Sequence, residues 1–289
     1  MIHVKSGDAH FIMRIKESDF YGEVHSLFKR TMNIRCLDSG VLYTVACRDL
    51  DNAPNTLIAD FTNIHVFDIK LNMRVSSSMH RLYIDDRMVL SVELTEQWVC
   101  KLPQFPVNYS KLKKNISVMK KYMHEFGQQG KRKRTEQLDH SFEKEVARLL
   151  QERSVVFVHE LYAGREEKAV NAAQRLLGLG PGLTPSGDDF LVGFFGVIHL
   201  PGGPLHSHTT LCCKILNQAA QYTNEISLAA LQQAANGRVR ECIVTLIDDL
   251  AYGTSEQVLT SLFDVLRIGS SSGMDIAMGI YSGMQLCCK

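Results

Sequence analysis

A glycine- and proline-rich segment, residues 178–189, carries the residue types best suited to bind a small anion. It reads Gly-Leu-Gly-Pro-Gly-Leu-Thr-Pro-Ser-Gly-Asp-Asp and lies between two helical patterns. Gly180 and Gly182 permit positive φ angles and a close approach of the backbone to a ligand. Thr184 followed by Pro185 predicts an N-cap and a first helical residue, so free N–H groups would meet an anion at a helix start. A Walker-type P-loop is excluded, because the segment has no lysine.

A second segment, residues 272–282, repeats the Ser-Gly-x-Asp pattern of the first. Each copy lies where a helix is predicted to begin, and Ser272 with Asp275 has nearly the arrangement of a capping box. The identical positions pair Ser186 with Ser272, Gly187 with Gly273, Asp189 with Asp275, and Gly193 with Gly279. We therefore predict that the two helix starts converge on one ligand.

Three carboxylates at these helix starts, Asp188, Asp189 and Asp275, are the predicted catalytic residues. Acidic side chains in a first helical turn also stabilise the helix dipole, so a structural role is the alternative. The adjacent Asp188 and Asp189 are also the predicted ligands of a hard cation such as Mg²⁺. No serine has an evident base beside it, so we predict no covalent nucleophile; N–H donors would stabilise an oxyanion instead.

A polar segment between the two loops, residues 223–227, is the remaining candidate. Thr223 and Ser227 are four residues apart and would share one face of a long predicted helix, with Asn224 beside them. They either line the same pocket or are ordinary polar groups of the helix. The predicted substrate-binding residues are Gly180, Gly182, Thr184, Ser186, Gly187, Thr223, Asn224, Ser227, Ser271, Ser272 and Gly273.

The elements that must position these residues form an α+β chain, with an N-terminal antiparallel β domain before a C-terminal α-helical domain. Alternating apolar residues predict a hairpin over 34–47, a half-buried strand over 65–75, and a second hairpin over 81–94. Helical spacing predicts helices over 111–129, 142–150, 166–177, 187–199, 209–235, 239–251, 256–267 and 273–287. We expect a β-rich domain over 1–108, a basic helix and linker over 109–140, and a helical domain over 141–289.

The charge balance is uneven along the chain, although 32 basic and 31 acidic residues leave a net charge of only +1. Residues 111–134 hold nine Lys or Arg and one acid, Glu125, and residues 127–134 are predicted to form a flexible charged connector. Nucleic-acid binding is disfavoured, because no aromatic residues interleave and no recognition module is evident. A solvated linker or a docking surface for an acidic partner fits better. No secretory signal or membrane span is evident, which predicts a cytoplasmic protein.

Residues 178–189, 223–227 and 269–275 together resemble a bacterial family that was long of unknown function and includes the AllH-type subunit of oxamate carbamoyltransferase. The resemblance covers residues 165–287 by motif and the N-terminal half by layout. It implies phosphorolysis of oxalurate, a small anionic substrate, to oxamate and carbamoyl phosphate in anaerobic allantoin breakdown. It also implies a hetero-complex with two other carbamoyltransferase subunits.

One position departs from the family pattern. The third motif often reads Gly-His-(Ser/Thr)-Ser-Gly, whereas this chain has Ser270 in place of the histidine. The chemistry would differ if that histidine serves as acid, base or ligand. Two alternatives therefore stay open: a carboxylase-like or other small-molecule enzyme that uses the same pocket, and a non-catalytic ligand-binding accessory subunit.

Overall fold

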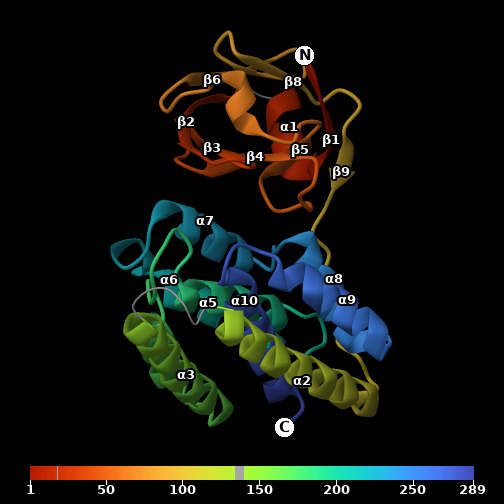
Figure 1. The fold of residues 1–289 in the computed structure, drawn as a ribbon, viewed down its shortest axis with the longest axis vertical. Helices are drawn as coiled ribbons and strands as arrows, with labels where there is room; N and C mark the ends of the chain where they lie inside the picture. Colours follow the sequence, from red (N-terminus) through yellow and green to blue (C-terminus); the bar gives the residue numbers. More distant parts are fainter. Residues whose placement is uncertain (18, 134–139) are drawn as a thin grey trace. The chain divides into compact units, whose positions relative to one another are not determined.

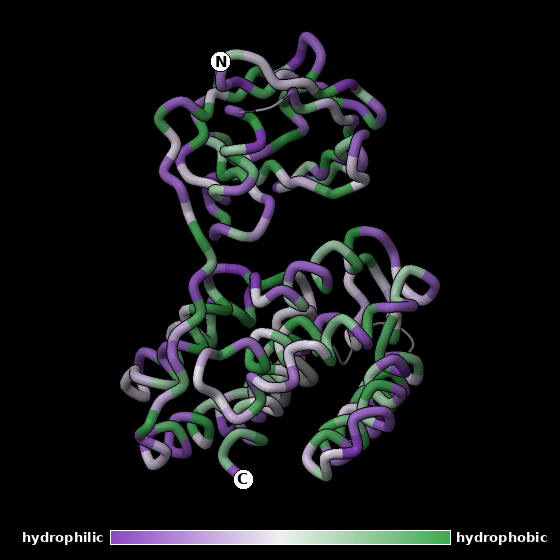
Figure 2. Tube along the Cα trace, turned by 180° about the vertical axis from the view of Figure 1, so that it is seen from behind, coloured by the Kyte–Doolittle hydropathy of each residue, from purple (hydrophilic) through white to green (hydrophobic). Residues whose placement is uncertain are grey.

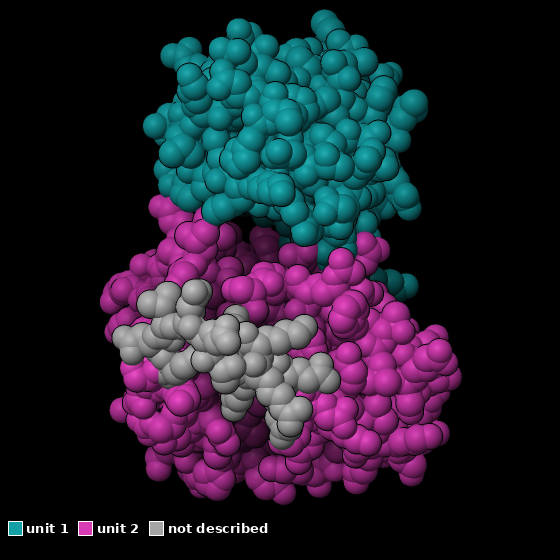
Figure 3. All heavy atoms as spheres, in the orientation of Figure 1, with its two compact units in different colours: residues 1–101 teal, residues 102–289 magenta. Residues whose placement is uncertain are grey.

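The computed structural model describes residues 1–17, 19–133 and 140–289. The chain divides into two compact units, residues 1–101 and residues 102–289 (Figures 1 and 3). The first unit is mainly β and the second is helical, so the α+β class is confirmed. None of the helices described has both the length and the apolar composition that a membrane crossing requires.

The first unit is built around one mixed sheet that closes on itself. Its nine strands follow the order β5-β4-β3-β2-β6-β7-β8-β1-β9, and β1 also pairs with β5, which makes the sheet barrel-like. The antiparallel prediction is only partly right, because the β1–β8, β1–β9 and β4–β5 pairs are parallel. The strands are β1 Ile2–Asp8, β2 Tyr21–Leu27, β3 Thr31–Cys36, β4 Leu42–Cys47, β5 Thr56–Ala59, β6 Arg74–Ser78, β7 Arg81–Ile84, β8 Met88–Ser91 and β9 Glu96–Trp98.

A helix that was not predicted from the sequence packs inside this closed sheet. Helix α1, Ala9–Glu17, buries Phe11, Ile12 and Ile15, whose spacing of three and four residues is helical. The Phe11 ring lies 4.3 Å from the Tyr43 ring of β4, between their centroids. The sequence pattern predicted only β structure in the first hundred residues, and this prediction is wrong at α1.

The two predicted hairpins are confirmed, but the strand over residues 65–75 is wrong. Strand β3 pairs antiparallel with β4, and β7 pairs antiparallel with β8. Residues 64–67 instead form the 3-10 helix η1, Ile64–Phe67, capped by the Asn63 side chain. Asp68 and Asn72 have φ angles of 49° and 65°, which an extended strand does not permit. Phe67, Ile69 and Met73 still pack against the core of this unit, but not as one face of a strand, and Val66 is 69% exposed.

The second unit consists of nine described α-helices and two short 3-10 helices. The predicted helix over 209–235 is broken into α6 and α7. Helix α2 includes residues 127–133, where a connector was predicted. The last residue of that predicted connector, Arg134, lies outside the described residues. The helices are α2 Tyr109–Lys133, α3 His140–Tyr162, α4 Glu166–Gln174, α5 Ser186–Ile198, η2 His206–His208, α6 Thr209–Leu216, η3 Ala219–Gln221, α7 Glu225–Ala234, α8 Glu241–Tyr252, α9 Ser255–Leu266 and α10 Ser272–Cys287.

Helices α5 and α10 lie in the middle of this unit and touch each other through their backbones (Figure 1). A Cβ atom on Gly193 of α5 would lie 2.1 Å from the Ile276 carbonyl oxygen of α10. The reverse also holds, because a Cβ on Gly279 of α10 would lie 2.0 Å from the Phe190 carbonyl oxygen of α5. The glycines that the two sequence repeats share therefore permit one close, reciprocal helix crossing.

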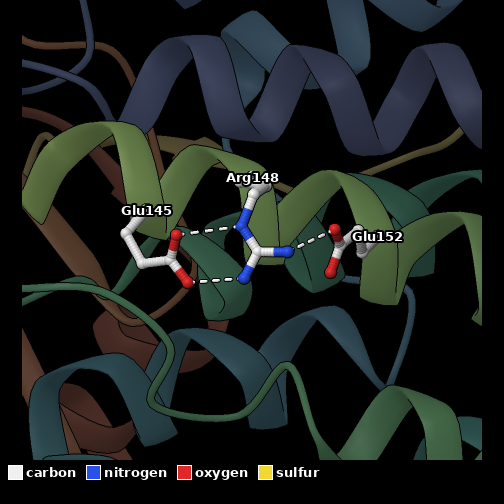
Figure 4. Close-up of polar contacts among 3 residues, drawn as sticks. All are labelled: Glu145, Arg148 and Glu152. Atoms are coloured by element: carbon white, nitrogen blue, oxygen red, sulfur yellow. Dashed lines mark hydrogen bonds and ion pairs between the residues drawn. The ribbon is translucent and has the colours of Figure 1, made fainter. Parts of the chain in front are cut away.

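The outer helix α3 alternates hydrophobic and hydrophilic residues along its length, as its mixed colours in Figure 2 show. On its exposed side the Arg148 guanidinium binds Glu145 and Glu152, at one turn's distance in each direction (Figure 4). The Glu145 carboxylate accepts bonds of 2.9 and 2.5 Å from Arg148 Nε and Nη2. Solvent screens these exposed ion pairs, so they contribute little to stability. The other face of α3 forms part of the candidate functional site.

Replacing Gly193 with alanine tests the helix crossing. The added Cβ would meet backbone rather than a flexible side chain, so we expect the free energy of unfolding to fall by about 3 kcal/mol, measured by urea denaturation. The matched control is Gly196→Ala on the same helix, where a Cβ would lie 3.5 Å from its nearest neighbour, the Ile247 side chain. This control gains up to about 1 kcal/mol of helix propensity, so equal losses in both variants would contradict the crossing.

Candidate functional site

The two predicted loops meet in the structure. Thr184 Oγ1, just before α5, lies 2.8 Å from Ser272 Oγ, the first residue of α10. This contact confirms that the helix starts converge. The capping predictions are wrong, however: the N-cap positions are Pro185 for α5 and Ser271 for α10, and neither helix has a side-chain cap. The hydroxyl groups of Thr184 and Ser272 face the opposite loop instead.

The serine and aspartate of each repeat bond across to the other repeat. The Ser186 hydroxyl of α5 hydrogen-bonds the Asp275 carboxylate of α10. Conversely, the Ser272 hydroxyl of α10, with Thr184, hydrogen-bonds the Asp189 carboxylate of α5. Two short motifs that resemble helix caps in the sequence thus form one reciprocal cluster, which we call the Ser–Asp cluster: Ser186, Asp189, Ser272 and Asp275.

The glycine of each motif is a packing position. A Cβ on Gly187 would lie 1.9 Å from the Leu176 carbonyl oxygen, and one on Gly273 would lie 2.2 Å from the Val265 carbonyl oxygen. Their N–H groups are also in use, because Gly187 donates to Leu179 O at 2.9 Å and Gly273 to Ile268 O at 3.0 Å. These two N–H groups therefore hold the loops together and are not free for an anion.

Asp188 lies in a separate, closed hydrogen-bond cluster. Its carboxylate accepts bonds from the Gly178 N–H at 2.9 Å, from the Ser227 hydroxyl at 2.7 Å, and from the Thr223 hydroxyl. The side chain is fully buried, and burial raises the pKa of Asp188 while these three bonds lower it. Asp188 therefore ties the glycine-rich loop to the start of α7.

A cation at Asp188 would have to compete with hydrogen bonds from the protein. Asp188 Oδ1 accepts one bond, from Gly178, and Oδ2 accepts two, from Thr223 and Ser227. Within the described part of the chain, His, Cys, Asp and Glu side chains form no group of three or more that could hold a metal ion. We therefore assign no step to Mg²⁺.

Residues 223–227 hold the glycine-rich loop in place, but not from positions along one helix, as was predicted. Thr223 precedes helix α7 rather than lying on it, and Asn224 is the N-cap, accepting bonds from Ile226 N–H at 3.0 Å and Ser227 N–H at 3.1 Å. The Asn224 amide also donates to the Leu183 carbonyl at 2.9 Å. The common face predicted from helical spacing is wrong, but Thr223 and Ser227 still meet at Asp188.

The two aspartates of the Ser–Asp cluster differ in access. Burial raises the pKa of Asp189 to about 7, against hydrogen bonds from Ser272 and Thr184, and the charge of Asp275 adds to the rise. Asp189 Oδ2 is buried with no hydrogen-bond partner among the described residues. Burial likewise raises the pKa of Asp275 to about 6, against the Ser186 bond, but Asp275 lines a cavity. Of these two equivalent acids, Asp275 therefore lines this cavity and Asp189 does not.

That cavity, which we call the α10 groove, has a volume of about 1130 Å³ and lies among helices α2, α3, α5 and α10. Four predicted site residues line it: Gly182, Ser186, Ser271 and Asp275. Ser270, the position at which the family often has histidine, lines it as well, so this departure changes the groove wall itself. The remaining predicted residues do not line the groove: Gly180, Thr184, Gly187, Asp188, Asp189, Thr223, Asn224, Ser227, Ser272 and Gly273.

Sequence reasoning missed the wall that α2 and α3 contribute. Lys120 and His124 of α2 and His159 of α3 line the groove, with apolar residues between them. No motif marks these positions. Their helical spacing predicts only a face, and which faces meet depends on how α2 and α3 pack.

The fold and the site define a two-unit α+β protein with paired Ser-Gly-x-Asp helix starts at the end of a groove. Residues 176–284 match the family described as oxamate carbamoyltransferase subunit AllH, and residues 3–97 match the AllH family N-terminal domain. The chain therefore belongs to the AllH family, as a carbamoyltransferase subunit. No solved structure matches it significantly.

Substitution by asparagine should lower the free energy of unfolding at Asp188 but not at Asp189. Asp188→Asn places an amide against three donors, so we expect a loss of about 3 kcal/mol in the free energy of unfolding at neutral pH. Asp189→Asn removes a buried charge that has an unpartnered oxygen, so stability should stay level or rise. Urea denaturation of both variants measures this; similar losses would show that Asp188 has no special anchoring role.

The raised pKa of Asp189 predicts a pH-dependent stability difference. The folded pKa, about 7, exceeds the ordinary value of 3.8, so ionising Asp189 costs more in the folded chain. Wild-type stability should therefore fall, relative to Asp189→Asn, as pH rises from 4 to 8, by roughly 4 kcal/mol, and the difference should stay constant above about pH 8. Urea denaturation at pH steps measures it. A difference that does not vary with pH would place the Asp189 pKa near its ordinary value.

Proposed function

We propose that the helical unit binds oxamate and its carbamoylated form, oxalurate, at the Ser–Asp end of the α10 groove. The observation that carries this proposal is the unequal access of two reciprocal acids: Asp275 lines the groove beside Ser186, whereas Asp189 is enclosed. An accessible carboxylate with a raised pKa suits proton transfer to and from a substrate nitrogen near neutral pH. The family's printed description, an oxamate carbamoyltransferase subunit, supplies the substrate class.

The reaction requires one proton transfer at the amide nitrogen of oxamate. In the phosphorolysis direction, a phosphate oxygen forms a bond to the carbamoyl carbon of oxalurate, and the bond from that carbon to the bridging nitrogen breaks. The electron pair remains on the nitrogen, which takes a proton from Asp275 as oxamate leaves. In the reverse direction, the Asp275 carboxylate removes that proton as the nitrogen attacks carbamoyl phosphate. The acid thus has a defined function in both directions.

The negatively charged groups of the substrate require hydrogen-bond donors, and the two loops have groups that could still serve as such donors. Gly182 has a φ angle of 96° and would have open space around an added Cβ, so the backbone there is accessible to a ligand. Ser186 and Ser271 line the groove at the positive ends of α5 and α10. A carboxylate at this place would be attracted by both helix dipoles. We assign Ser186 to substrate orientation through Asp275, and Asp189 to positioning of Ser272 and Thr184.

Substitution of the two acids in the reconstituted complex with its partner subunits tests the assignment. Asp275→Asn should lower kcat by about 10²-fold or more, because it removes the acid–base group. Asp189→Asn should lower kcat less than tenfold, because Asp189 acts only through its neighbours. Asp264→Asn on α9 is the control for loss of an exposed negative charge in the same unit.

Two outcomes would contradict the proposal. Unchanged turnover in Asp275→Asn, with oxamate binding retained in calorimetry, would make the chain a non-catalytic ligand-binding subunit. Loss of turnover in Asp189→Asn equal to that in Asp275→Asn would mean that the two acids are functionally equivalent.

A further inference from the structure

The start of helix α7 holds the glycine-rich loop at both of its ends. At the first end, Gly178 donates its N–H to Asp188, and α7 binds the same carboxylate through the Ser227 hydroxyl at 2.7 Å. At the other end, the Asn224 amide donates to the Leu183 carbonyl oxygen at 2.9 Å. The backbone between these two points is therefore fixed by one neighbouring helix start.

The Asn224 contact also fixes the direction of the next N–H group along the loop. A trans peptide bond places its C=O and N–H on opposite sides, and none of the described residues has a cis peptide. Because the Leu183 carbonyl points to Asn224, the Thr184 N–H points away from it. Among the described residues, the N–H groups of Gly182, Leu183 and Thr184 donate to no protein group. Three donors therefore remain for a ligand in this part of the loop.

Pro185 limits the conformation of Thr184 from the other side. The residue before a proline is disfavoured from the helical conformation, and Pro185 itself is buried with a φ angle of −55°. The Thr184 hydroxyl is held as well, by Ser272 at 2.8 Å. A donor whose direction is fixed before the ligand arrives loses less conformational entropy on binding. The Thr184 N–H is therefore a preorganised donor.

We propose that Asn224 is a positioning residue for the substrate, which holds the Leu183–Thr184 peptide so that the Thr184 N–H binds the carboxylate of oxamate. The assignment rests on the proposed function, because it names a donor for the carboxylate placed at the Ser–Asp end of the groove. The N–H precedes α5, where the helix dipole favours an anion. Asn224 does not touch the substrate and acts only through this peptide.

The two hydrogen-bonding functions of Asn224 are separable by substitution. Its Oδ1 caps α7, whereas its Nδ2 holds the loop. Asn224→Ser and Asn224→Asp both keep a capping oxygen and remove the donor, so the free energy of unfolding, measured by urea denaturation, should stay near wild type.

Substrate binding should change in both variants. Calorimetry on the reconstituted complex should show about tenfold weaker binding of oxamate or more, because a hydrogen bond to a charged group is lost. The KM for oxamate should rise by the same factor while kcat stays within about threefold of wild type, because the carboxylate is bound equally in the ground state and the transition state. A purely structural role would not produce this division between KM and kcat.

Thr254→Ala is the control for loss of a helix cap in the same unit, because Thr254 caps α9. It should lower stability and leave the affinity for oxamate at the wild-type value. Wild-type affinity in Asn224→Ser would overturn the assignment. Weaker binding in Asn224→Asp alone would also overturn it, because the new charge rather than the lost donor would then be the cause.

The proposed function fails in a different way. If the wild-type complex does not bind oxamate, the proposed function is overturned, and the assignment of Asn224 with it. If the wild-type complex binds oxamate and both Asn224 variants bind it equally well, only the role of Asn224 is overturned.

Discussion

The close backbone contact between α5 and α10 is the constraint on which the rest of the helical unit depends. Gly193 and Gly279 each face a carbonyl oxygen of the other helix, at positions where any Cβ would overlap it. Because the two contacts are reciprocal, the helices cross at one defined place along both. Their N-terminal ends are then brought together, and Ser186 and Ser272 reach the aspartates of the opposite repeat.

The surroundings of this crossing make two equivalent acids unequal. Asp189 and Asp275 occupy matching positions in the repeats, and burial raises the pKa of both. The difference comes from their neighbours: the glycine-rich loop, held to α7 through Asp188 and Asn224, lies beside Asp189, while Asp275 opens onto the groove of α2 and α3. A nearly symmetric framework thus supplies one enclosed acid and one accessible acid.

Local secondary structure was predicted well where it depends on residues that are neighbours in the sequence. The turns over residues 38–40 and 85–87 connect the expected hairpins, and most helices of the second unit begin and end within a few residues of their predicted bounds. Prediction failed where polar residues override a pattern. Asp68 and Asn72 take left-handed conformations in an apparent strand, and Asn224 starts a new helix inside an apparently continuous one.

By itself, the sequence determined the α+β division, the paired Ser-Gly-x-Asp motifs and the family. These follow from residue type and spacing, which act over a few residues or repeat visibly along the chain. Only the tertiary structure decided that Asp188 is an anchor, that Asp189 is enclosed, and that Asp275 faces a groove. Those assignments depend on which helix covers which side chain, and burial by residues such as Thr223 and Ser227, some 35 positions away, leaves no mark on local spacing.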